Sequence, residues 1–209
     1  MPEEGYVVSQ PATSLAGGFR LPTFFGLANA LYIFQCKLAI RKDILSGRDS
    51  WHMPPGNETA VSIILCQDHL LLLKRKERSN DPWSGDMCFP GGFVKDGETP
   101  LMASIRELKE ETGIDRDSIT FKFEHKIFHP VRSSSINVHT FVFQCSEMIP
   151  VEPDSEIERG GWYRIGAEIN ERDDRKGDFI RWNGDIVWGL TYRIYDSLRN
   201  AFKELEERH

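Results

Sequence analysis

The stretch GFVKDGETPLMASIRELKEETGI, residues 92–114, decides the fold of this chain. It contains a helix that is bounded by its own start and stop signals. Thr99 is a good N-cap residue, Pro100 suits the first helical position, and Gly113 suits the position that ends a helix. We therefore predict a helix over residues 100–112.

The predicted helix has two different faces when successive residues are placed about 100° apart. Three carboxylates, those of Glu107, Glu110 and Glu111, share one face, where like charges repel and the helix end disfavours anions. This cluster indicates either a bound cation such as Mg²⁺ or Mn²⁺, which suit oxygen ligands, or a solvated acidic surface. The other face is apolar and is expected to pack on the core through Leu101, Ile105, Leu108 and Thr112.

The same stretch resembles the Nudix box, G-x5-E-x7-R-E-U-x-E-E-x-G-U, at every fixed position. The similarity to the Nudix family extends over residues 58–200. It implies an α/β/α sandwich with a mixed sheet, and hydrolysis of a nucleoside diphosphate linked to another moiety with Mg²⁺ or Mn²⁺ as cofactor. The matching residues are Gly92, Glu98, Arg106, Glu107, Leu108, Glu110, Glu111, Gly113 and Ile114.

The resemblance also implies roles for individual residues. Glu107 and Glu111 would be metal ligands, and Glu110 would be a further ligand or the catalytic base. The backbone carbonyl of Gly91 would join the ligands, and Arg106 would orient the glutamates by salt bridges. The metal would polarise the pyrophosphate and lower the pKa of a bound water.

A later acidic loop offers a further catalytic acid, with Asp154, Glu156 and Glu158 as candidates. We favour Glu156, because Glu156-Ile157 followed by Trp162 resembles the E-V-x4-W stretch of the family. A solvated acidic loop is the alternative interpretation.

Several residues near the box are candidates for binding the substrate. The Gly91-Gly92 turn allows the backbone to approach a ligand closely. Arg75, at the end of a predicted strand, and His129 and Arg132, on a polar loop, could contact phosphate or the rest of the substrate. An exposed strand end and a plain surface loop are the alternatives for these three.

Two further stretches resemble the coenzyme A diphosphatase branch, namely residues 82–92 and Trp188–Thr191. The chain departs from that branch at Ser84 and Asp86, where a His-containing, Gly-Gln type sequence is usual. Coenzyme A or a derivative is therefore one candidate substrate, and nucleotide sugars, dinucleotides and oxidised nucleoside triphosphates are others. A non-catalytic nucleotide-binding module is disfavoured by the complete box, and an RNA-decapping type of enzyme by the lack of a dense basic run.

Composition places the chain among globular proteins, with 209 residues, 40% of them hydrophobic. A net charge of −6 disfavours duplex nucleic acid as a partner and leaves a small nucleotide derivative as the expected substrate. The four cysteines are far apart and are expected to be reduced, which suggests a cytoplasmic protein.

The start of the chain is expected to form a separate extension. Residues 1–52 are interpreted as this extension, loose at first and helical over 24–46, ahead of a catalytic domain over 53–209. The apolar run Leu21–Ile40 is nearly long enough to span a membrane, but polar residues interrupt it and the chain begins with acidic residues. We expect it to pack on the domain or on the partner subunit of a homodimer.

Outside the box, periodicity predicts mostly strands. Asn183-Gly184 is a strong signal for a type I′ hairpin turn. The expected elements are strands at 60–66, 69–75, 87–89, 119–128, 138–145 and 161–165, a hairpin over 179–188, and an amphipathic helix over 191–205.

Overall fold

The computed structural model describes residues 57–79, 83–131 and 133–207. The helix expected over 24–46, its suggested contact with a domain or a partner subunit, and the domain boundary near residue 52 lie outside the described residues. Among these residues, no helix is both long enough and apolar enough to cross a membrane.

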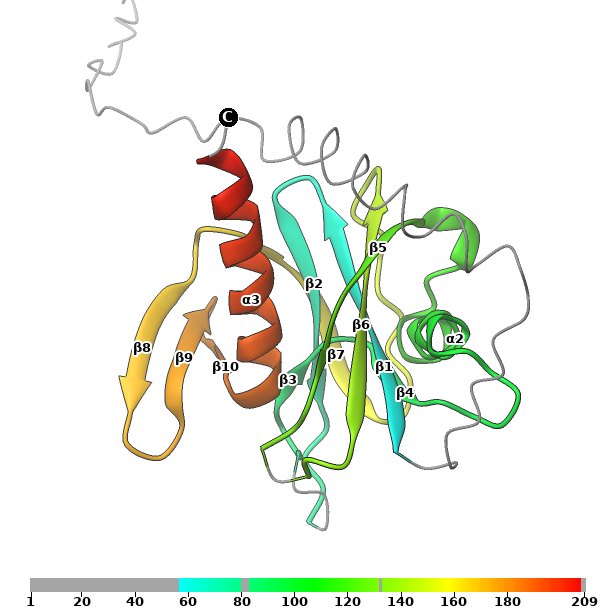
Figure 1. The fold of residues 1–209 in the computed structure, drawn as a ribbon, viewed down its shortest axis with the longest axis horizontal. Helices are drawn as coiled ribbons and strands as arrows, with labels where there is room; N and C mark the ends of the chain where they lie inside the picture. Colours follow the sequence, from blue (N-terminus) through cyan, green and yellow to red (C-terminus); the bar gives the residue numbers. More distant parts are fainter. Residues whose placement is uncertain (1–56, 80–82, 132, 208–209) are drawn as a thin grey trace, which may run out of the picture.

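A mixed sheet forms the centre of the described part (Figure 1). Its seven strands are β1 (Glu58–Cys66), β2 (His69–Arg75), β3 (Met87–Cys88), β4 (Gly91–Phe93), β5 (Thr120–Phe128), β6 (Asn137–Cys145) and β7 (Ile157–Arg164). Strand β1 is parallel to β6 and antiparallel to β2 and β4. Strand β5 extends the sheet beyond β6, and β3 and β7 both pair with β2.

Helices cover both faces of this sheet. Helix α2 (Pro100–Thr112) packs on one face, and a short 3-10 turn, η1 (Arg116–Ser118), follows it. Helix α3 (Gly189–Glu206) lies on the other side together with a small second sheet (Figure 1). The strands of that sheet are β8 (Ile169–Asp173), β9 (Gly177–Trp182) and β10 (Asp185–Val187). The expected α/β/α sandwich with a mixed sheet is confirmed.

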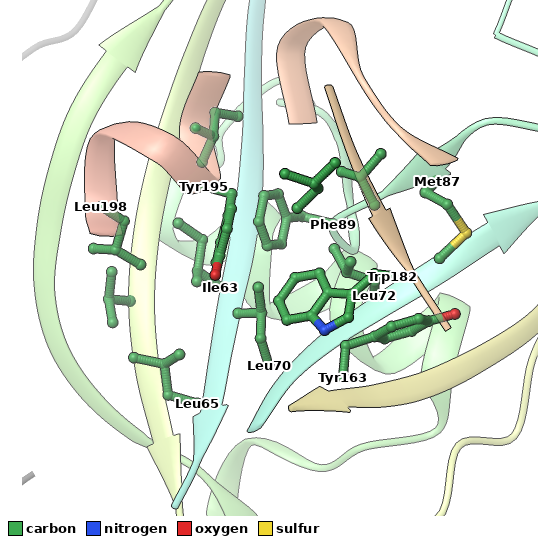
Figure 2. Packing of buried hydrophobic residues seen from close by; sticks show 14 of the residues in the cluster. Ile63, Leu65, Leu70, Leu72, Met87, Phe89, Tyr163, Trp182, Tyr195 and Leu198 are labelled. Carbon is green, nitrogen blue, oxygen red and sulfur yellow. The ribbon is translucent and has the colours of Figure 1, made fainter. Parts of the chain in front are cut away.

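Each face of the central sheet has its own core, because successive residues of a strand point to opposite faces. On the α3 side, the fully buried Trp182 lies between the rings of Tyr163 and Tyr195, with centroid distances of 5.5 and 5.0 Å (Figure 2). On the α2 side, Leu108 packs with Ile64 and other buried strand residues. The sheet is thus held on both sides, and α2 is fixed against it.

The strands and the hairpin turn agree with the sequence-based expectations in most places. Asn183 and Gly184 both have positive φ, 51° and 90°, as a type I′ turn requires. Residues 90–92 were expected to be a turn, but residues 91–93 pair with β1 as strand β4. Strand β8 was missed because it is rich in charge. It is stabilised across the hairpin by ion pairs such as Arg181–Glu171.

Three of the four cysteines lie within the described residues. Cys66, Cys88 and Cys145 are free thiols, as expected. Cys36 lies outside the described part of the chain.

Candidate active site

Helix α2 begins and ends at the predicted residues. The Thr99 hydroxyl accepts a hydrogen bond of 3.2 Å from the backbone N–H of Met102. Gly113 adopts a left-handed conformation, with φ 75°, and its N–H donates to the carbonyl of Lys109. Local sequence signals fix both ends of the helix. The helical positions that can face the sheet are therefore limited as well.

The buried face of α2 is rotated relative to the expected apolar face. Leu108 and Thr112 are buried as predicted, but Leu101 and Ile105 are only partly buried. Glu111 takes a place on the buried face instead and is only 7% exposed. A carboxylate is therefore turned inward, toward the Gly91-Gly92 strand.

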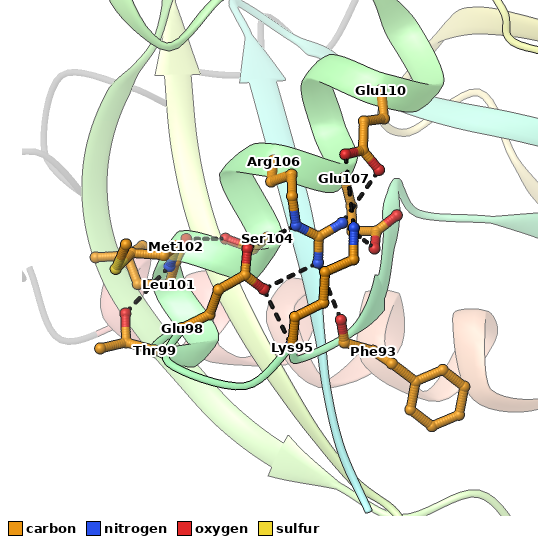
Figure 3. Close-up of polar contacts among 10 residues, drawn as sticks. All are labelled: Phe93, Lys95, Glu98, Thr99, Leu101, Met102, Ser104, Arg106, Glu107 and Glu110. Atoms are coloured by element: carbon orange, nitrogen blue, oxygen red, sulfur yellow. Dashed lines mark hydrogen bonds and ion pairs between the residues drawn. The ribbon is translucent and has the colours of Figure 1, made fainter. Parts of the chain in front are cut away.

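Arg106 is the centre of a network that orders the acidic side chains (Figure 3). Its Nε and Nη2 donate to the two carboxylate oxygens of Glu98 at 2.6 and 3.0 Å. Its Nη1 donates to Glu107 at 2.5 Å and to Glu110 at 3.1 Å. Nη2 also donates to the carbonyl of Phe93 at 3.0 Å, which ties the helix to the end of β4.

In this network, Arg106 and Glu98 each stabilise the charged form of the other. The hydrogen bond from Arg106 lowers the pKa of Glu98, and the same bond raises the pKa of Arg106. Planar, two-oxygen pairing of this kind fixes orientation as well as charge. The geometry supports the role proposed for Arg106 in orienting the glutamates.

Glu111 has the most strongly perturbed carboxylate of the helix. Burial raises its pKa to about 8, partly opposed by a hydrogen bond of 2.8 Å from the Gly91 N–H. The charges of Glu107 and Asp154 raise the pKa further, and Arg75 lowers it. Glu111 is therefore close enough to all three residues for their charges to act on it. A buried carboxylate with acidic neighbours suits a position where a cation binds.

Glu107 lies directly over the backbone of Gly92. A Cβ atom at Gly92 would stand 2.6 Å from both Cδ and Oε1 of Glu107, closer than real contacts allow. The missing side chain at Gly92 therefore makes the space that the Glu107 carboxylate occupies. The pairing of β4 with β1 fixes Gly92 there, opposite Ala60.

Glu110 differs from its two neighbours. Its side chain is 50% exposed and pairs with Arg106 and, at 3.8 Å, with Lys95. Within the described residues, no three His, Cys, Asp or Glu side chains converge closely enough to hold a metal ion by themselves. The assignment of Glu110 as a ligand or base stays a prediction.

The donor set nevertheless suits a hard divalent cation. Glu107 and Glu111 supply carboxylates, and the neighbouring glycine backbone is close to both. Mg²⁺ usually keeps several waters and binds proteins through one or two carboxylates, so a third protein carboxylate is not required.

In the later acidic loop, the carboxylates of Asp154 and Glu156 have different surroundings. The Glu156 carboxylate is about half exposed and pairs with Arg78 at 3.3 Å. The Asp154 carboxylate accepts the backbone N–H groups of Glu156 and Ile157 at 2.8 and 3.0 Å, and its charge acts on Glu111. The sequence identified the loop, but the resemblance to the E-V-x4-W stretch favoured a different residue in it.

Two of the three candidate substrate residues, Arg75 and His129, lie within the described part of the chain. Arg75 lies at the end of β2, and its charge acts on both Glu111 and Cys88. His129 is exposed, with Nδ1 at 3.2 Å from the carbonyl of Ile136. Arg132 lies outside the described residues.

The fold and the site together define a class of proteins. In this class, a helix packs on a mixed sheet and carries glutamates that an arginine of the same helix holds in place. A family model of the NUDIX domain matches residues 56–182, more than half of the chain. The chain therefore belongs to the Nudix family.

Individual relatives agree with this assignment. An RNA pyrophosphohydrolase of Aliivibrio fischeri is 36% identical over 157 residues, which cover 71% of this chain and 82% of the relative. An ADP-ribose pyrophosphatase of Methanocaldococcus jannaschii is 50% identical over 56 residues, 26% of this chain. The chain spans 31% of the length of that second relative.

A solved structure shows the same fold. It is a bifunctional NMN adenylyltransferase/ADP ribose pyrophosphatase from Francisella tularensis, complexed with AMP and a Mn ion. The TM-score is 0.52 at 21% identity, over 84% of this chain and 48% of the other.

Proposed function

We propose that this protein hydrolyses the pyrophosphate bond of a nucleoside diphosphate linked to another moiety. The observation that carries the proposal is the Glu111 carboxylate, buried against the Gly91 N–H beside Glu107. Within the protein alone this arrangement is unfavourable, since burial and two acidic neighbours oppose ionisation. A divalent cation offsets that cost.

Glu107, Glu111 and the backbone carbonyl of Gly91 would hold Mg²⁺ or Mn²⁺. A cation held there would polarise the pyrophosphate and lower the pKa of a bound water. Arg106 keeps Glu107 in place. Arg75, whose charge acts on Glu111, would bind a substrate phosphate. The family membership and the pyrophosphohydrolase relatives support the same chemistry.

In the hydrolytic step, the water oxygen bonds to phosphorus and the bridging P–O bond breaks. The proton of the water passes to a carboxylate. Asp154 is the acceptor that we propose, because the backbone N–H groups of Glu156 and Ile157 hold its carboxylate at 2.8 and 3.0 Å and its charge acts on Glu111. Glu110 and Glu156 are the acceptors that the sequence suggests.

Matched variants separate these acceptors. Asp154→Asn keeps an oxygen for the two backbone N–H groups but cannot accept the proton, so we expect kcat to fall about 100-fold or more. Glu156→Gln and Glu110→Gln should then retain most of kcat. If Asp154→Asn keeps full kcat while Glu156→Gln or Glu110→Gln loses it, the residue whose variant loses kcat is the proton acceptor instead.

The moiety beyond the pyrophosphate is best identified with a substrate panel and product analysis. We expect cleavage of an ADP-linked small molecule, with ADP-ribose and coenzyme A as the first compounds to test. RNA with a 5′-triphosphate is a second candidate, because of the 36% identical RNA pyrophosphohydrolase. Preference for RNA would be recognised by activity that falls steeply with salt. No cleavage of any pyrophosphate compound with Mg²⁺ or Mn²⁺ would refute the proposed function.

A further inference from the structure

Two residues at the start of α3 direct their polar groups toward β3 rather than toward their own helix. The indole Nε1 of Trp188 donates to the Asp86 carboxylate at 2.8 Å. The hydroxyl of Thr191 donates to the carbonyl of Met87 at 2.9 Å. Trp188 is the N-cap residue of α3, yet its side chain caps no helical N–H.

The segment that they contact leads directly to the glutamate site. Asp86 and Met87 are followed by Cys88, Phe89 and Pro90, and then by Gly91. The far end of this segment is held by β1, where the Ser62 N–H donates to the Pro90 carbonyl at 2.8 Å. Beyond that bond, the Gly91 N–H meets Glu111 at 2.8 Å.

The near end is held by β2 and α3 together. The Arg75 N–H donates to the Asp86 carbonyl at 3.0 Å, and β3 pairs with β2 over only two residues. A two-residue ladder alone is a weak constraint on a strand. The side chains of Trp188 and Thr191 add two side-chain hydrogen bonds at this end.

We propose that Trp188 and Thr191 are positioning residues, which fix the Asp86–Gly91 segment so that Gly91 meets Glu111 in the geometry that binds the cation. Both residues come after the last residue that the family model matches. The expected change in Mn²⁺ affinity rests on the proposed function. The inference also predicts faster hydrogen–deuterium exchange over residues 86–91 in variants of the metal-free protein.

The test compares conservative variants of the full chain. Trp188→Phe keeps the aromatic ring and removes the N–H, and Thr191→Val keeps the shape and removes the hydroxyl. Thr191→Ser restores the donor. Trp182→Phe is the matched control: it also removes an indole bond, from Nε1 to the carbonyl of Arg164 at 2.8 Å, at a fully buried site that bonds β7 instead of β3.

Two measurements read the effect independently of turnover. Hydrogen–deuterium exchange of the metal-free protein should show faster exchange of peptides covering residues 86–91 in Trp188→Phe and Thr191→Val, but not in Thr191→Ser. Binding of Mn²⁺, followed by the paramagnetic resonance of the free ion, should weaken about 10-fold in the double variant Trp188→Phe/Thr191→Val. Loss of groups that orient metal ligands has effects of this size. Trp182→Phe should lower Tm and leave both readouts of the site unchanged.

The outcomes separate this inference from the proposed function. The positioning role would be overturned if the folded double variant showed the same hydrogen–deuterium exchange over residues 86–91 and the same Mn²⁺ affinity as the wild-type protein. Equal effects in Trp182→Phe would also overturn it, because they would show a general loss of stability. If the wild-type protein binds no Mn²⁺, the proposed function fails, and faster exchange over residues 86–91 would still show that the two residues fix the segment.

Discussion

Gly92→Ala is expected to disable the site without unfolding the protein. The new Cβ would stand 2.6 Å from Cδ and Oε1 of Glu107, whereas ordinary contact begins at 3.4 Å. The carboxylate must therefore move by about 0.8 Å, against the hydrogen bond that Arg106 donates to it. A misplacement of about 1 Å in a catalytic group can cost about 100-fold in rate, so we expect kcat to fall by about that factor.

The backbone should tolerate the substitution, since Gly92 lacks the positive φ that disfavours alanine. Gly161→Ala is a suitable control, because it makes the same change on β7 without a positive φ, with its nearest contact a ring carbon of Tyr163 at 3.2 Å. Steady-state kinetics and thermal unfolding of both variants make the comparison. Wild-type kcat in a folded Gly92→Ala variant would refute the argument that Glu107 needs this space.

Three further predictions concern the arginine, the buried glutamate and the cation. Arg106→Lys should lower kcat at least about 10-fold and lower Tm, because an ammonium with three N–H donors cannot replace the five hydrogen bonds of the guanidinium to Glu98, Glu107, Glu110 and the Phe93 carbonyl. Wild-type kinetics would contradict this. The raised pKa of Glu111, about 8, means that the folded state holds a proton that the unfolded state releases above about pH 4.3. In EDTA, wild-type stability should therefore fall by about 2–3 kcal/mol between pH 6 and 8 in urea unfolding, and Glu111→Gln should lose this dependence along with turnover; identical pH profiles would contradict it. EDTA should stop hydrolysis and Mg²⁺ or Mn²⁺ should restore it, and an EDTA-resistant rate would count against the mechanism.

The sequence predicted α2 residue for residue because its signals are local. Thr99, Pro100 and Gly113 set its ends through contacts within a few residues. The strands β1, β2 and β6 were predicted nearly as well, since their apolar runs are long, and β5 was predicted although polar residues interrupt it. Family resemblance then supplied the layered fold.

What the sequence missed depends on contacts between distant residues. Glu111 is buried because β4 pairs with β1 and brings Gly91 under the helix, which a helical projection cannot show. The prediction of Glu156 as the further catalytic acid stays untested, and the effect of the Asp154 charge on Glu111 arises only in the folded chain. The hydrogen bond from Trp188 to Asp86 joins residues 102 positions apart, so no local sequence pattern predicts it.

The most direct test is a crystal of the protein grown or soaked with Mn²⁺, with anomalous scattering recorded at the manganese edge. We expect a peak between the carboxylates of Glu107 and Glu111, within bonding distance of the Gly91 backbone carbonyl. No peak there at saturating Mn²⁺, or a peak bound only by other residues, would contradict the claim that these two glutamates form a cation site.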